Sequence, residues 1–214
     1  MESAPMDTDN LTRSRLEVFI LRVVSPLLFW VRLKNSDRDL QEMEEELALR
    51  MSHRSKFLLI WPEDLEPDMD VVIKVGDGWQ RGWIEKISRV SNTVRVRLGD
   101  HAWSTWRPMH EIYRLEDRFR SLPWQAVVCK LAHSGSPTNT TTWPEKIQEL
   151  CRLLAEDYTG WINIVLPAGR GKALVKLTVQ GENNAGTFNF RDILVKLKHV
   201  KLSPQEWPDV SPSL

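Results

Sequence analysis

Residues 69–113 read MDVVIKVGDGWQRGWIEKISRVSNTVRVRLGDHAWSTWRPMHEIY. Short runs of β-branched and aromatic residues alternate here with polar turns, which is the pattern of an all-β segment. The turns are Gly76-Asp77-Gly78 and Ser91-Asn92. The predicted strands are Asp70–Val75, Gly82–Val90, Thr93–Leu98, Ser104–Pro108 and the short Glu111–Tyr113. Five short strands joined by tight turns predict a small closed barrel.

The residues before this barrel predict two strands and a helix. Leu16–Val24 and Leu27–Leu33 are rich in large apolar residues and are divided by the turn dipeptide Ser25-Pro26, so we expect an antiparallel pair. A helix is predicted from about Asp37 to Ser52, because apolar residues recur there at helical spacing. These apolar residues are Leu40, Met43, Leu47 and Met51, and Ser36 with Asp39 forms a candidate capping box.

The residues after the barrel predict one more helix among further strands. Gln125–Ala132 is a predicted strand, and a helix is expected to follow the candidate capping box of Thr142 and Glu145. Its apolar stripe is Ile147, Leu150, Cys151 and Leu154. The remaining predicted strands are Trp161–Leu166, Leu174–Val179, Thr187–Phe190 and Ile193–Leu197. The chain is therefore expected to be mostly β with two α-helices.

The composition excludes several classes of protein. With 42% hydrophobic and 27% charged residues in 214, the chain is typical of a globular protein. Lys plus Arg and Asp plus Glu both total 29, so no overall charge attracts nucleic acid or anionic membrane. The apolar stretch Leu16–Leu33 contains Glu17, Arg22 and Arg32, which argues against a membrane span. Cys129 and Cys151 are interpreted as core thiols in a reducing compartment.

Three motifs together resemble an extended Tudor domain. They are residues 23–31 (VVSPLLFWV), the signature Asp77-Gly78-Trp79-x-Arg81, and Phe119 followed by residues 122–131 (LPWQAVVCKL). In that family, a Tudor SH3-like barrel is inserted into a staphylococcal-nuclease-like OB fold, and the likeness covers nearly the whole chain. The resemblance implies recognition of short peptide tails, typically symmetrically dimethylated arginines of PIWI-type Argonaute proteins, and it implies no catalysis.

The resemblance also sets the expected domain boundaries. Residues 1–14 are expected to be a flexible N-terminus, and residues 15–66 to supply the first strands of the OB-like lobe and a linker helix. Residues 67–115 are expected to form the Tudor barrel and residues 116–202 the rest of the OB-like lobe. Residues 203–214, with three prolines, are expected to be a flexible tail.

The methylarginine pocket of the family is largely replaced in this chain. A methylated guanidinium is normally captured by several aromatic faces through cation–π attraction. The family places aromatic residues at the end of the first barrel strand, after the signature Trp and around an Asp-Tyr-Gly-Asn motif, whose Asn forms hydrogen bonds. The corresponding positions here are Val75, Gln80, Leu98, His101 and Trp103. We therefore predict a degenerate cage.

Four tryptophans in the barrel segment have two interpretations. Trp79 and Trp83 are expected to pack in the fold, since Trp79 occupies the structural Trp position of the family. Trp103 and Trp106 follow the turn beside the altered cage and are equally consistent with packing or with an exposed surface for an unmethylated peptide. Trp106 is therefore a candidate interaction residue.

Two rival functions depend on charged side chains. Arg81, Lys86, Arg89, Arg95 and Arg97 could line a groove for single-stranded RNA, because OB folds bind single strands in this way. Alternation of arginines with apolar residues is, however, what any half-exposed strand shows, so we favour a solvated face. Asp157, Glu182 and Asp192 could surround a metal in a nuclease, but their spacing is not diagnostic and no pair of positioned arginines can be identified.

We accordingly predict a non-catalytic adaptor of the germline piRNA pathway, which binds a protein partner independently of arginine methylation. A residual dimethylarginine reader and a single-stranded RNA-binding OB module are the alternatives. The partners implied by the resemblance are a PIWI-type Argonaute, an RNA helicase or another Tudor protein. No cofactor, metal or membrane is expected, and the expected location is the cytoplasm, in perinuclear germ granules.

Overall fold

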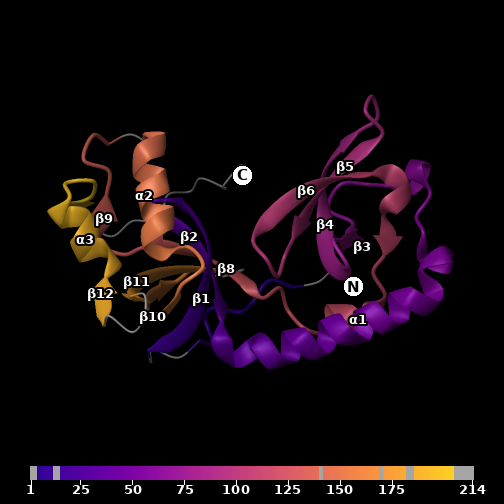
Figure 1. Ribbon diagram of the computed structural model, residues 1–214, viewed down its shortest axis with the longest axis horizontal. Helices are drawn as coiled ribbons and strands as arrows, with labels where there is room; N and C mark the ends of the chain where they lie inside the picture. The colour runs from indigo at the N-terminus through magenta and orange to yellow at the C-terminus, as the bar shows by residue number, and fades with distance from the viewer. Residues whose placement is uncertain (1–3, 12–14, 140–141, 169–170, 182–185, 205–214) are drawn as a thin grey trace. The chain divides into compact units, whose positions relative to one another are not determined.

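The computed structural model describes residues 4–11, 15–139, 142–168, 171–181 and 186–204 (Figure 1). The chain divides into two compact units, each built from segments distant in sequence. Unit 1 contains residues 1–6 and 35–126, and unit 2 contains residues 7–34 and 127–214. The barrel segment thus interrupts the segment that forms the second unit.

Unit 1 is a five-stranded barrel sheet of the kind the sequence predicts. Its strands are β3 (Asp70–Val75), β4 (Gly78–Ser88), β5 (Thr93–Leu98), β6 (Trp103–Pro108) and β7 (Tyr113–Arg114). They lie in the order β6-β5-β4-β3-β7. Strand β4 begins four residues earlier than predicted, because Gly76 and Asp77 are enough to turn the chain and Gly78 already pairs with Val75. The barrel core is apolar and includes Ile73, Ile84, Val94, Val96 and Leu98.

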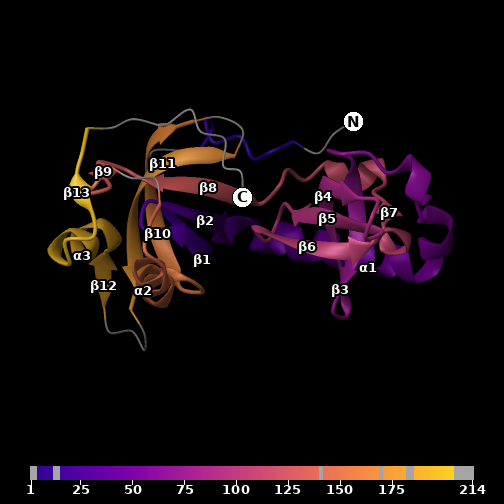
Figure 2. The ribbon, with the colours of Figure 1, turned by 90° about the horizontal axis from the view of Figure 1, so that it is seen from above.

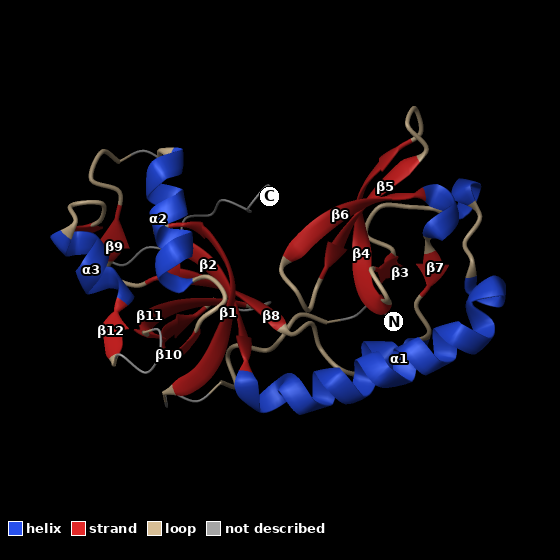
Figure 3. Cartoon of the chain, viewed as in Figure 1, coloured by secondary structure: helices blue, strands red, loops and turns tan. Residues whose placement is uncertain are grey.

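Helix α1 (Asp37–Leu58) covers the outer side of the barrel in unit 1 (Figure 3). Leu47 and Met51 of the helix pack with Val72, Leu115 and Phe119 in a second apolar cluster. The helix extends six residues beyond the predicted end at Ser52, and Leu58 also packs against this cluster. Ser36 is the N-cap residue, but its side chain makes no capping hydrogen bond, so the predicted capping box does not form. Short 3-10 turns lie at Lys34–Ser36, Pro62–Asp64, Met109–Glu111 and Asp117–Arg120.

Unit 2 has the ring of strands expected for an OB fold (Figure 2). Its strands are β1 (Leu16–Ser25), β2 (Leu28–Leu33), β8 (Ala126–Leu131), β10 (Thr159–Pro167), β11 (Lys172–Gln180) and β12 (Thr187–Asn189). They follow the order β10-β1-β2-β8-β11-β12, and the additional pairing of β10 with β11 closes a five-stranded ring. A small separate sheet pairs β9 (Ser134–Gly135) with β13 (Lys201–Leu202).

Two further helices belong to unit 2. Helix α2 (Glu145–Ala155) is the predicted second helix, with Cys151 and Ala155 buried. Its N-cap is Pro144 without a side-chain cap, so the predicted capping box of Thr142 and Glu145 is wrong.

The predicted strand Ile193–Leu197 is wrong, because this segment lies in helix α3 (Phe190–Lys196). The Asn189 side chain caps the helix by accepting a hydrogen bond from the Asp192 amide. Phe190 and Leu194, four residues apart, are both buried. This i,i+4 pair is a helical signal that the short run of β-branched residues obscured. The fold class, mostly β with a Tudor barrel and an OB-like unit, is nevertheless as predicted.

Both cysteines are buried and unpaired, as the sequence predicts. Burial raises the pKa of the Cys151 thiol to about 12 and raises the pKa of Cys129 as well, so both thiols are protonated in the fold. In the N-terminal segment, the Ala4 carbonyl accepts a hydrogen bond from the Trp124 amide, and Thr8 is fully buried. Among the described residues, no helix is long and apolar enough to cross a membrane.

Candidate functional site

The Asp77-Gly78-Trp79-x-Arg81 signature lies in the β3–β4 hairpin of unit 1. Trp79 stands opposite Lys74 on the outer face of the sheet, where it packs with the α1 cluster. Its ring meets that of Tyr113 edge-on at a centroid distance of 5.1 Å. Trp79 therefore packs in the fold, as the sequence predicts.

Arg81 lies on the same outer face and is the largest fully buried side chain of unit 1. Its Nε and Nη2 atoms donate to the two carboxylate oxygens of Asp100 at 2.8 and 3.0 Å. Its Nη1 atom donates to the carbonyls of Phe119 and Leu122, and Nη2 donates to that of Pro123. Since carbonyl and carboxylate together satisfy the guanidinium, Arg81 fixes the Leu122-Pro123 segment to the barrel.

Asp100 and its neighbours complete this buried network. Asp100 also accepts a hydrogen bond of 2.9 Å from the Gln125 amide. The indole of Trp124 lies against the Arg81 guanidinium, 4.7 Å from its Cζ, and against Trp83 at a centroid distance of 5.3 Å. Gly99 has no room for a side chain, because a Cβ there would lie 2.2 Å from the Trp124 ring. Trp83 therefore also packs, and the surviving family residues act in the fold.

Among the five residues that the sequence predicts as cage positions, Val75 and Leu98 are aliphatic. Leu98 is fully buried in the barrel core, and Val75, half-buried at the end of β3, packs against that same core. Neither side chain offers an aromatic face to a cation. At these two candidate cage positions the side chains therefore pack in or against the barrel core.

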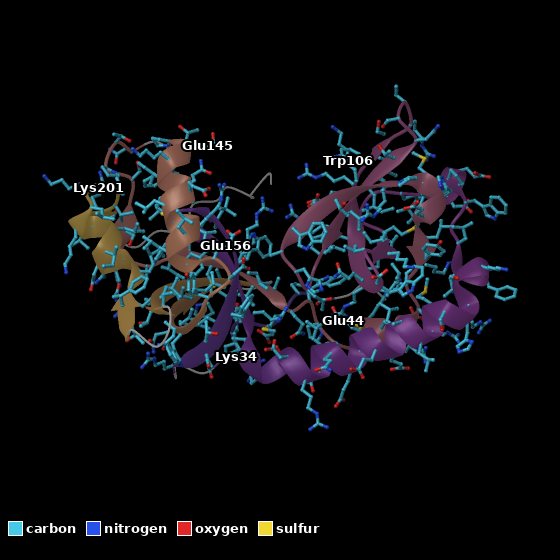
Figure 4. All side chains as sticks on the ribbon, in the orientation of Figure 1. Lys34, Glu44, Trp106, Glu145, Glu156 and Lys201 are labelled. Atoms are coloured by element: carbon cyan, nitrogen blue, oxygen red, sulfur yellow. The ribbon has the colours of Figure 1, made fainter. Side chains whose placement is uncertain are left out.

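Gln80 and His101 place polar groups at two further cage positions. Gln80 stands opposite Ile73 and so faces the barrel core side of the sheet. Its Oε1 atom is buried and has no hydrogen-bond partner among the described residues. The Nε2 atom of His101 lies 2.9 Å from Oε1 of Glu44. Glu44 is on helix α1 and is labelled in Figure 4. His101 is thus engaged with a carboxylate of its own unit.

The structure separates the two tryptophans that the sequence left undecided. Trp103 is partly buried and packs against the barrel core. Trp106 is 46% exposed on β6 and is labelled in Figure 4. Trp103 and Trp106 are three residues apart on one strand and therefore point to opposite faces, so they do not form one surface.

The proposed basic groove does not form as a free cluster. Arg81 is buried with Asp100, while Arg95 and Arg97 both pair with Glu85, at 3.1 and 2.6 Å. Arg89 donates to the carbonyls of Pro62 and Leu65. These arginines also belong to the Tudor barrel and not to the OB-like unit.

Two of the three acidic residues proposed for a nuclease lie in the described part of the chain, and both are exposed. Asp157 and Asp192 lie at the surface, and Asp192 bonds with its neighbour Arg191. Glu182 lies outside the described residues. In the part of the chain that the structure describes, no three His, Cys, Asp or Glu side chains are grouped to hold a metal ion.

Sequence reasoning missed two residues of unit 1. Glu85 accepts hydrogen bonds from Arg97 at 2.7 Å and from Ser104 at 2.8 Å, besides its ion pair with Arg95. Glu44, on helix α1, lies within hydrogen-bond distance of the His101 ring. The sequence held no signal for either contact, since both join elements that are distant in sequence.

Comparison with known proteins places this geometry in context. The family model of the Tudor domain matches residues 11–133. No curated protein matches this chain by sequence. Among solved structures, the extended Tudor domain TD3 of mouse TDRD1, in complex with a MILI peptide containing dimethylarginine, is 18% identical with a TM-score of 0.78. The likeness covers 94% of this chain and 98% of that one.

Two further structures have the same fold. The human TDRD1 extended Tudor domain, in complex with a symmetrically dimethylated E2F peptide, is 16% identical with a TM-score of 0.77, covering 94% of this chain and 96% of that one. A mutant of the Drosophila melanogaster Papi extended Tudor domain, in complex with an unmethylated Piwi N-terminal peptide, is 20% identical with a TM-score of 0.73. That likeness covers 88% of this chain and 99% of the Papi domain. These likenesses show that the chain has the extended Tudor fold.

Proposed function

The chain belongs to the Tudor domain family, and from this premise we propose that it is a non-catalytic protein-interaction adaptor of the germline piRNA pathway that does not require arginine methylation. The single observation that carries the proposal is the state of the cage positions. Val75 and Leu98 are aliphatic and packed against the core, and His101 is engaged with Glu44. A cage of aromatic faces is absent from these described positions.

The polar side chain of Gln80 also supports binding that does not require arginine methylation. Where the family has an aromatic ring, this chain has a buried amide oxygen with no partner among the described residues. Such an oxygen is stabilised by a donated N–H and is not satisfied by a methyl group. Methylation of a ligand arginine removes N–H donors, so it would bring no gain at this position.

The fold itself accommodates peptides of both kinds in other proteins. The TDRD1 structures hold dimethylated peptides, and the Papi structure holds an unmethylated Piwi peptide. On this basis a PIWI-type Argonaute is the first partner we propose, with an RNA helicase or another Tudor protein of the pathway as the alternatives. We propose a cytoplasmic location in perinuclear germ granules, where such partners would meet the chain.

Two other functions make different predictions. A residual reader of symmetric dimethylarginine would need Trp103 and His101 to supply aromatic faces. A single-stranded RNA-binding module would need free cations, but Arg81, Arg95 and Arg97 have carboxylate partners. RNA binding would also fall steeply with salt.

The test is a calorimetric titration of the full chain with an arginine-glycine peptide, unmethylated and symmetrically dimethylated, alongside affinity purification from germline extract. We expect no preference for the methylated peptide and one protein partner recovered in high yield. Clearly tighter binding of the methylated peptide would contradict methylation independence. Titration with an oligouridine at low salt is the matched test for RNA, and its binding would favour the OB-module alternative.

A further inference from the structure

The outer edge of β6 carries backbone groups that no other strand of the described residues pairs with. In the part of the chain that the structure describes, β6 pairs with β5 on one side and is a terminal strand of the sheet order β6-β5-β4-β3-β7. A terminal strand presents a row of N–H and C=O groups on which an extended segment can be added.

The hydrogen bond that follows β6 shows which residues direct these groups outward. Pro108 stands opposite Thr93, and the next residue, Met109, donates from its amide to the Asn92 carbonyl at 3.0 Å. In an antiparallel ladder, residues that bond with the neighbouring strand alternate with residues that direct their groups away. Counting back from Met109 by two, residues 107, 105 and 103 bond with β5, so Ser104 and Trp106 face the outer edge.

The hydrogen bonds of the Trp106 carbonyl also indicate that it points to the outer edge, away from β5. It accepts hydrogen bonds from the Thr105 Oγ1 and Arg107 Nη1 atoms, both at 3.5 Å. Both donors are side chains of adjacent residues, and both distances lie at the outer limit of a hydrogen bond. This carbonyl therefore lacks the short backbone bond that a strand interior provides, and an added strand could supply it.

The outer face beside this edge is built from one row of side chains. Lys86 stands opposite Arg95, and Arg95 stands opposite Trp106, so the three side chains lie next to one another on one face across β4, β5 and β6. Trp106 is 46% exposed and the Arg95 side chain 37% exposed. An apolar anchor thus lies at the edge, with two cations behind it.

The charge of this row selects the partner. Lys86, Arg95 and Arg97 lie on neighbouring strands β4 and β5, and the one carboxylate of Glu85 pairs with both arginines. These four side chains together are therefore positively charged. A second copy of this chain would bring the same positive row to the edge and would be repelled. A segment with acidic side chains is complementary.

We propose that the β6 edge binds an extended, acidic segment of a partner protein as an added strand, with an apolar side chain packed on Trp106 and carboxylates facing Lys86 and Arg95. The proposal rests on the proposed adaptor function and gives it a partner chemistry. In strand addition, main-chain hydrogen bonds provide the affinity, and alternate side chains of the added segment provide the specificity. Methylated arginine has no part in this contact.

In the experiment, a random library of displayed 12-residue peptides is selected for binding to the immobilised full chain. The enriched peptides are then synthesised, and their affinities for the chain are measured. We expect peptides in which acidic and apolar residues alternate. Binding should slow hydrogen exchange at the Ser104 and Trp106 amides, which a contact through side chains alone would not do. Trp106→Ala should weaken binding by at least about tenfold and Lys86→Glu by about threefold or more, since an aromatic anchor and its flanking charge carry such contacts.

Trp61→Ala is the matched control, because Trp61 is another exposed tryptophan of unit 1, 67% exposed, and should leave binding unchanged. Failure to enrich any peptide, or enrichment of peptides that bind Trp106→Ala as tightly, overturns strand addition at β6. If such peptides still bind the chain without methylation, the adaptor function stands while the β6 proposal fails. If only methylated peptides bind, both fail.

Discussion

The Arg81 guanidinium and the Asp100 carboxylate form a two-point ion pair inside unit 1, with side chains 0% and 2% exposed. The pair joins β4 to the turn after β5, and through three carbonyls it also holds residues 119–123. Arg81 of the signature motif therefore has a structural role, and its replacement should destabilise unit 1.

Arg81→Met should lower the free energy of unfolding by about 3–5 kcal/mol, because it leaves the Asp100 carboxylate buried without its cation. Urea denaturation followed by tryptophan fluorescence measures the change. Arg38→Met is the control, since Arg38 pairs with Glu42 on the helix surface at 87% side-chain exposure and should leave the free energy of unfolding unchanged. Equal effects of the two substitutions would contradict the structural role of Arg81.

Gly99→Ala should destabilise unit 1 by about 1–3 kcal/mol, because its Cβ would overlap the Trp124 ring at 2.2 Å and approach Trp83 at 2.9 Å. Two packed indoles cannot move aside as a flexible side chain could. Gly78→Ala is the matched control, as its Cβ would meet only the Val75 carbonyl at 3.8 Å. Thermal melts of the two variants should differ clearly, and matching melts would argue against the tight packing at Gly99.

Trp103 and Trp106 should respond differently to truncation. Trp103→Ala removes packing from the barrel core and should cost about 2–4 kcal/mol, whereas Trp106→Ala should change stability by less than about 0.5 kcal/mol. Chemical denaturation of each variant checks this. Partner binding that is insensitive to Trp106→Ala in the folded protein would remove Trp106 from the interaction surface.

Glu116 should make the free energy of unfolding depend on pH in the acidic range. The pKa of its carboxyl is lowered from the ordinary value of 4.5, chiefly because it accepts hydrogen bonds from Arg50, although burial acts in the opposite direction. Because the unfolded state binds this proton more tightly, the pair stabilises the fold above the ordinary pKa. That contribution is lost as pH falls through the lowered pKa.

Glu116→Gln should therefore flatten the loss of stability on acidification between about pH 5 and pH 3. Urea midpoints measured across this range for both proteins provide the test. Glu63→Gln, at an exposed position, should leave the pH profile unchanged. An unchanged profile for Glu116→Gln would show that the Arg50 contact does not form in solution.

Restoring aromatic residues should restore methylarginine preference if the cage is degenerate. The triple variant Val75→Phe, Gln80→Tyr and His101→Tyr leaves the core residue Leu98 intact. We expect it to bind a symmetrically dimethylated arginine-glycine peptide about tenfold more tightly than the unmethylated one, since cation–π contacts are worth about 1–2 kcal/mol when desolvated. The natural chain should show no such difference by calorimetry, and a preference already present there would show that its cage functions.

Much of the fold could be predicted because its signals are local. Alternation in Val94–Leu98 and the turn at Gly76-Asp77-Gly78 specify β5 and the β3–β4 hairpin without help from distant residues. The segment 193–197 failed for the same reason, because a few β-branched residues are compatible with strand or helix. The Asn189 cap and the burial of Phe190 and Leu194 decide for the helix.

The candidate site depended more strongly on three-dimensional contacts. The sequence could place Val75, Gln80, Leu98, His101 and Trp103 at the cage positions only through the family resemblance. It could not show that Gln80 has a buried oxygen or that His101 meets Glu44, because these facts depend on which element packs over the turn after β5. The basic alternation in β5 likewise gave no sign that Glu85 pairs with Arg95 and Arg97.

The sequence by itself determined the five barrel strands, the first two helices and the resemblance to the Tudor family, because periodicity, turn residues and motif identity are properties of neighbouring positions. Only the tertiary structure decided that Arg81 forms a buried ion pair with Asp100 and that Trp103 packs against the core while Trp106 is exposed. It also decided that β6 is a terminal strand of its sheet. The physical reason is that burial and ion pairing depend on distances between residues such as Arg81 and Pro123, 42 positions apart, which the chain fixes only by folding.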